Sequence, residues 1–146
     1  MSYVQKNLLE GEHIVYRARL HPIIFALPIA LVLAGLALAW YFWSWIIAAI
    51  ALGLAIIVAF PRFLRYISSE FAVTNKRVVV KTGLIYRDTL ELVLTKLETI
   101  GVDQTIPGRL FNYGTITITG TGGTKEPFRD ISKPLEFRKH VQSQLA

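Results

Sequence analysis

The longest run of apolar positions extends over residues 23–60 and contains no Asp, Glu, Lys, Arg or His. A bilayer core of about 30 Å is crossed by about 20 helical residues. One helix over the whole run would be nearly twice too long for a single span. The pattern therefore predicts a transmembrane hairpin with two spans, at about residues 23–40 and 45–60.

The predicted tip of this hairpin is rich in aromatic residues and holds all three tryptophans of the chain. Indole and phenol rings favour the headgroup level of a bilayer, where the ring is partly apolar and its polar group stays hydrated. An aromatic-rich part of one long helix in a soluble protein is the alternative interpretation. The pattern predicts four interfacial anchors: Trp40, Tyr41, Trp43 and Trp45.

Alanine recurs every four residues in both predicted spans, which places small side chains along one face of each helix. Such faces let two helix backbones approach closely. They are expected to pack the two helices of the hairpin together or to mediate oligomers. The residues are Ala26, Ala30 and Ala34 in the first span, and Ala51, Ala55 and Ala59 in the second.

Basic residues flank the hairpin and are absent from its tip: Arg17 and Arg19 precede it, and Arg62 and Arg65 follow it. Because Lys and Arg are retained on the cytoplasmic side, we expect a multi-pass protein of the cell membrane with both termini cytoplasmic. A secretory signal peptide is the alternative, since residues 37–39 resemble a cleavage site. The apolar run continues past that point, which favours a membrane anchor.

Beyond the hairpin the hydrophobic period changes from helical to alternating. Residues 115–119 show this most clearly, with isoleucines on one face of a predicted strand and threonines on the other. Glycine-rich and Asn-Lys turns separate the segments, and about six short strands are expected. They are residues 70–74, 77–82, 89–95, 100–102, 115–119 and 124–131, and a helical turn is expected in the link at 109–111.

The chain ends in a helical pattern, because Phe137, Val141 and Leu145 recur every four residues. Ser132 is suited to cap this helix and Pro134 to its first turn. Strands followed by one helix predict an antiparallel sheet or barrel that the helix covers. The expected organisation is an N-terminal cytoplasmic arm at 1–22, whose path the pattern leaves open, the hairpin at 23–60 and a cytoplasmic domain at 61–146.

Two segments of this domain resemble a known family. Residues 71–83, FAVTNKRVVVKTG, are similar to the opening hxhTxxRhhhxxG hairpin of bacterial pleckstrin-homology-like (PH-like) domains, and residues 108–118 resemble the family's G-x-L-h-x-Y-G-x-h-x-h segment. A two-span hairpin before the domain is the arrangement of membrane-bound members. The resemblance implies a mainly-β PH-like barrel of about seven strands, capped by a C-terminal helix. It also implies a non-enzymatic binding or assembly module.

The formal charge is +6, and residues 61–146 carry 13 Lys and Arg against 8 Asp and Glu. A basic domain held at a membrane is expected to lie against anionic headgroups. The resemblance gives Arg77 an alternative role, stabilising the fold as the motif arginine. The phosphoinositide pattern of eukaryotic PH domains is incomplete here, which disfavours that ligand. The predicted lipid contacts are Arg62, Arg65, Lys76, Arg77, Lys81 and Arg87.

Other classes of function find little support in the sequence. Cysteine is absent, and the three histidines, His13, His21 and His140, have no metal-site spacing. No catalytic constellation, cofactor motif, small-molecule site or nucleic-acid motif is recognised. The predicted function is a membrane protein that presents a PH-like module to a protein partner or to itself. A small transport or channel component built from the hairpins and a lipid-headgroup-binding module are the alternatives.

Overall fold

The computed structural model describes residues 2–146, which form two compact units. One unit consists of residues up to His21 together with Ser68–Ala146, and the other is Pro22–Ile67. The chain therefore leaves the first unit at His21 and returns to it at Ser68. We refer to the first unit as the domain and to the second as the helical hairpin.

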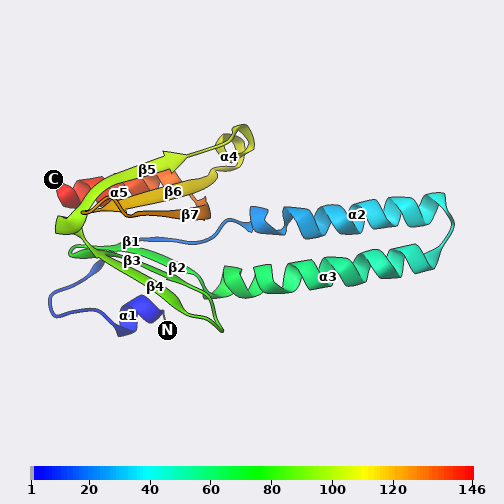
Figure 1. Cartoon of the computed structure of the whole chain (residues 1–146), viewed down its shortest axis with the longest axis horizontal. Helices are drawn as coiled ribbons and strands as arrows, with labels where there is room; N and C mark the ends of the chain where they lie inside the picture. The colour runs from blue at the N-terminus through cyan, green and yellow to red at the C-terminus, as the bar shows by residue number, and fades with distance from the viewer. Residues whose placement is uncertain (1) are drawn as a thin grey trace. The chain divides into compact units, whose positions relative to one another are not determined.

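The helical hairpin contains α2, Ala26–Tyr41, and α3, Trp45–Ser68 (Figure 1). A 3-10 turn, Pro22–Phe25, leads into α2. The segments Pro22–Phe42 and Trp45–Ser68 are long and apolar enough to cross a membrane, by length and composition. The second helix does not end at Pro61 but continues through it for two further turns.

The two helices lie close together at Gly35, which is buried. A Cβ added to Gly35 would lie only 2.0 Å from the Cβ of Ala51, so a side chain there would force the helices apart. On α3, Ala55 is buried and Ala51 and Ala59 are half-buried. The α2 alanines do not form the packing face that the sequence predicts within the hairpin, because the side chains of Ala26, Ala30 and Ala34 are exposed.

The first sheet of the domain has the order β1-β2-β3-β4, and all its neighbouring strands are antiparallel. Its strands are β1, Ile14–Ala18; β2, Glu70–Thr74; β3, Arg77–Thr82; and β4, Asp88–Val93. The N-terminal arm thus supplies the first strand, a path that the sequence pattern had left open. Since β1 precedes the helical hairpin and β2 follows it, the hairpin is the connection between two adjacent strands.

The second sheet has the order β5-β6-β7. Its strands are β5, Leu97–Asp103; β6, Tyr113–Gly120; and β7, Lys125–Ser132. The short helix α4, Ile106–Phe111, connects β5 to β6, and the 3-10 turn Leu94–Lys96 connects the two sheets. Together with the final helix α5, Pro134–Leu145, this is the seven-stranded PH-like fold that the resemblance implied.

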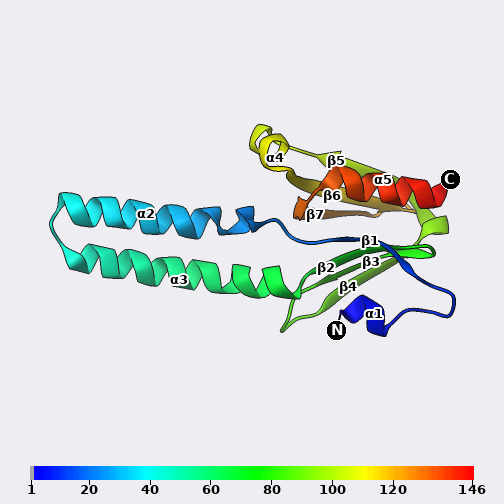
Figure 2. The same ribbon diagram turned by 180° about the vertical axis from the view of Figure 1, so that it is seen from behind.

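The core of the domain lies between the sheets and under α5, which contacts β1 and β2 of one sheet and β5 and β6 of the other (Figure 2). Ile116 and Ile118 alternate with half-buried threonines and are almost fully buried, which confirms the predicted phase of this strand. Phe137 and Val141 of α5 are also buried. Ser132 does not cap α5, because Lys133, with a φ of 51°, takes the position before Pro134.

Candidate functional site

The N-terminal segment, which is the part of the chain before β1 (residues 2–13), covers the outer face of the first sheet. Ala72 and Val79 are paired across β2 and β3, and they point away from the core because their strand neighbours point into it. The helix α1, Tyr3–Lys6, places the buried Val4 on both residues. The backbone N–H groups of Tyr3 and Val4 donate to the Glu70 carboxylate, at 2.9 and 3.4 Å. The segment is therefore a packed layer of the domain.

Arg77 at the start of β3 fastens this layer through its guanidinium. Its Nε donates to Glu12 Oε1 at 2.9 Å, and one terminal nitrogen donates to Glu12 Oε2 at 3.1 Å and to the carbonyl of Asn7 at 2.7 Å. The other terminal nitrogen pairs with Glu91 on β4. The Glu12 side chain is completely buried and that of Arg77 is 12% exposed. Such a two-point pair fixes geometry as well as charge.

Thr74 links the same pair to the turn between β2 and β3. Its hydroxyl donates to Glu12 Oε1 at 2.7 Å and accepts from the backbone N–H groups of Lys76 and Arg77. A threonine that satisfies turn amides in this way stabilises the turn locally. The threonine and arginine of the Thr-x-x-Arg motif thus have a structural role, which favours the fold-stabilising alternative for Arg77.

Opposing effects act on the Glu12 carboxyl. Burial raises its pKa, but hydrogen bonds from Arg77, the Leu9 N–H and Thr74, with the positive charge of Arg77, outweigh burial and leave the pKa below its usual range. The hydrogen bond to Glu12 raises the pKa of Arg77. Both groups are therefore charged around neutral pH, and the pair is a permanent ionic contact.

Like Arg77, two lysines among the predicted lipid contacts also bind the N-terminal segment. Lys76 Nζ donates to the carbonyl of Glu10 at 2.6 Å, and Lys81 Nζ lies 5.1 Å from the centre of the Tyr3 ring. With Arg77, three of the six predicted basic residues are thus engaged within the domain. Arg87 is exposed in the turn between β3 and β4. The side chains at these six positions therefore do not form one basic pocket.

Arg62 and Arg65 lie on the last turns of α3, and Arg62 donates to the carbonyl of Val58 at 3.0 Å. At the hairpin tip the four predicted aromatic anchors are strongly exposed, between 79% and 86%. Trp43 adopts a left-handed φ of 50° within the short link, and the Ser44 N–H donates to the carbonyl of Ala39. The tip thus presents its aromatic rings outward.

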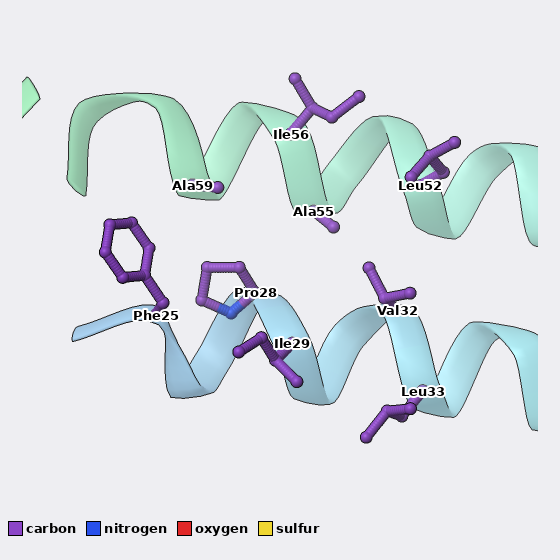
Figure 3. A pocket seen from close by; sticks show the side chains of 9 residues that line it. All are labelled: Phe25, Pro28, Ile29, Val32, Leu33, Leu52, Ala55, Ile56 and Ala59. Atoms are coloured by element: carbon purple, nitrogen blue, oxygen red, sulfur yellow. The ribbon is translucent and has the colours of Figure 1, made fainter. Parts of the chain in front are cut away.

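An apolar groove of about 540 Å³ runs between α2 and α3 (Figure 3). Phe25, Pro28 and Val32 point across it toward α3, and Ala55 points back toward α2. Each side chain that lines the groove is apolar. It offers no hydrogen-bonding group for a polar ligand, which needs at least a few placed polar contacts.

Glu12 is the site residue that the sequence analysis missed. It lies 65 positions from Arg77 along the chain. The sequence gives no signal that marks it, because Glu10 is a second acidic residue two positions away and no local pattern pairs either residue with Arg77. Within residues 2–146, no group of three or more His, Asp and Glu side chains is placed to hold a metal ion.

Three comparisons relate the chain to known proteins. A sequence model of the family described as "Bacterial PH domain" matches residues 19–145. No curated relative matches the chain. A solved DUF1696 family protein with a pleckstrin-homology domain, from Shewanella loihica PV-4, is similar at 16% identity with a TM-score of 0.41, covering 56% of this chain and 74% of that one.

Proposed function

Because the chain belongs to the bacterial PH domain family, we propose that it is a membrane-anchored, non-enzymatic interaction module. In this proposal α2 and α3 span the cell membrane, and the domain sits at the cytoplasmic surface. Domains of this fold generally serve as interaction modules rather than as catalysts. The ligand is a protein partner or a second copy of the chain.

The exposure of the helical hairpin carries this proposal. Leu33, Ile57 and Phe60 are 62%, 69% and 62% exposed, and most of the outward surface of both helices is of the same kind. Burying such a side chain contributes about 1.5–3 kcal/mol, so a whole apolar hairpin in water would be strongly unfavourable. A core helix of a soluble protein would be mostly buried, whereas only 17% and 6% of the two most apolar windows are.

The hairpin itself lacks the groups that an ion or proton pathway uses. No charged residue occurs within residues 23–60. Ionisable side chains inside a membrane usually mark a transport route. Anchoring supplies a sufficient reason for two such helices, and the aromatic tip fits the far interface.

Cysteine labelling in intact cells tests the topology, because the chain has no cysteine of its own. An impermeant maleimide should label Ser44→Cys at the hairpin tip in intact cells. It should label Thr124→Cys, on the exposed turn between β6 and β7, only after lysis. Labelling of Thr124→Cys from outside would contradict a cytoplasmic domain, and loss of both proteins in a carbonate wash would contradict membrane insertion.

A further inference from the structure

The chain leaves and re-enters the domain at one end of the first sheet. β1 and β2 are antiparallel neighbours, with Ala18 opposite Phe71. The exit at His21 therefore follows the end of β1, and the return at Ser68 precedes the start of β2 at the same end. If the hairpin spans a bilayer, the short connections place this end of the domain at the headgroup level.

The turn between β3 and β4 lies beside the return point, because Lys81 pairs with Glu70 and Thr82 with Asp88. Its side chains are unusually exposed for apolar groups: Leu84 50%, Ile85 90% and Tyr86 86%. Gly83 fixes the turn, with a φ of 84° and no room for a Cβ, which would lie 2.0 Å from the carbonyl oxygen of Tyr86. The turn thus holds an apolar tip outward.

The helix α4 lies beside the exit point. Tyr113, which starts β6 just after α4, stacks on the His21 ring with centres 5.1 Å apart. Thr105 caps the helix by accepting from the Gly108 N–H, and Asn112 ends it in a left-handed conformation. The helix is well built, yet it exposes three large apolar side chains, Ile106 at 76%, Leu110 at 77% and Phe111 at 60%.

We propose that the β3–β4 turn and α4 insert into the interface of the bilayer that holds the hairpin, as two further contacts of the domain with lipid. This inference rests on the proposed membrane anchoring. The turn and α4 lie at the same end of the domain (Figure 1). Exposed apolar clusters of this kind mark membrane or protein contacts, and here both lie beside the points where the chain departs for the apolar helices.

The exposed side chains at the tips of these elements favour apolar insertion over electrostatic attraction. Arg19, Arg87, Arg109 and Lys133 are exposed near them, together with Asp88 and Asp103. The side chains proposed to insert are themselves uncharged, so their contact with lipid should persist at high salt. The lipid contact predicted for Lys76, Arg77 and Lys81 is of the opposite kind, since screening would weaken it.

Depth-dependent fluorescence quenching tests the inference in the full chain reconstituted into phosphatidylcholine vesicles with a minority of phosphatidylglycerol. A bimane label is placed on Ile85→Cys, on Leu110→Cys or on the control Thr124→Cys, which lies on the turn at the other end of β6. Nitroxide groups near the top of the lipid acyl chains act as quenchers. All three tryptophans lie at the hairpin tip, so their quenching reports hairpin insertion independently in each sample.

We expect the labels at Ile85→Cys and Leu110→Cys to lose a fraction of emission comparable with that of the tryptophans, in low and in high salt. The label at Thr124→Cys should lose almost none.

Quenched tryptophans with labels that behave like the control would overturn the inference and leave the anchoring intact. Unquenched tryptophans would overturn the anchoring itself. Labels that are shielded from water but not quenched by lipid would assign these elements to a second copy of the chain, against a lipid contact.

Discussion

Replacement of Arg77 by methionine gives the sharpest test of the N-terminal layer. Arg77→Met keeps a long apolar side chain but removes the guanidinium that contacts Glu12, Glu91 and the Asn7 carbonyl. The Glu12 carboxylate then remains fully buried without its counter-charge. Breaking a buried ion pair on one side is far more costly than replacing the whole pair.

The expected loss follows from the contacts that remain. Removing one member of a buried pair costs about 3–5 kcal/mol. Glu12 keeps its hydrogen bonds from the Leu9 N–H and the Thr74 hydroxyl, both 2.7 Å long, which offset part of this cost. We therefore expect a loss of about 3 kcal/mol in the free energy of unfolding, a large share of the roughly 5–15 kcal/mol typical of a domain. The double variant Glu12→Gln Arg77→Met should lose less than Arg77→Met alone, because no unpaired charge is left.

The pH dependence of the stability gives a second, independent test, because the direction of the change can be predicted. The pKa of Glu12 is lowered in the folded protein, so its contribution is present above the unfolded value of about 4.5 and is lost as pH falls through the folded value. In Arg77→Met, protonation instead relieves an unpaired buried charge. The difference in stability between the natural protein and Arg77→Met should therefore shrink as pH falls from 7 to below 4.5.

Hydrogen exchange followed by mass spectrometry suits the measurement, because it resolves amides of β2 and β3 in the full chain in detergent micelles. A urea series converts their protection into a free energy of opening. Lys125→Met is the matched control, since Lys125 is exposed at the start of β7. A loss no larger than that of the control, or one that stays constant with pH, would refute the assignment of Arg77 and Glu12 as a buried structural pair.

Further substitutions test the core, the hairpin and the lysine contacts. Ile118→Asp should cost several kcal/mol, because it buries an unpaired charge in a position that is 2% exposed, whereas Thr117→Asp should be mild; equal exchange protection in both would contradict the strand phase. Gly35→Val should increase the distance between spin labels on α2 and α3, while Gly53→Val, with open space around it, should leave that distance unchanged. Lys76→Glu should speed amide exchange around Glu10, and Lys125→Glu should not; identical rates would show that the Lys76 contact is not formed.

The strands and the C-terminal helix were largely predictable because their signals are local. Alternation at 115–119 and the four-residue period of Phe137 and Val141 each report which side chains face the core, and the structure places them there. The conformation of Lys133 before α5 carried no such pattern. The Lys133 N–H donates to the carbonyl of Asn112 at 3.0 Å, a contact between residues far apart in the chain.

The N-terminal layer was not predictable, since every contact that holds it joins residues far apart in the chain. Glu12 and Arg77 carry no local pattern that pairs them, and a domain starting at residue 61 would lack both β1 and Glu12. The face of α2 that packs against α3 differs from the predicted alanine face for another reason. Regular alanine spacing marks a face of small residues, but rotation about the helix axis decides which face meets the partner. On α2 that face contains Gly35.

The insertion of α2 and α3 between β1 and β2 has a consequence for synthesis of the protein. Neighbouring antiparallel strands usually follow each other within a few residues. Here β1 cannot pair with β2 until the whole hairpin has been synthesised. At ribosomal speed that interval lasts on the order of seconds. If the hairpin inserts into a bilayer, β2 reaches β1 only when both helices have crossed and the chain has returned to the starting side. A chain with one helix crossed leaves the two strands in different compartments, and its first sheet cannot form. In that case, completion of the first sheet would require correct insertion of both helices, and a chain with one helix crossed would keep β1 and β2 unpaired.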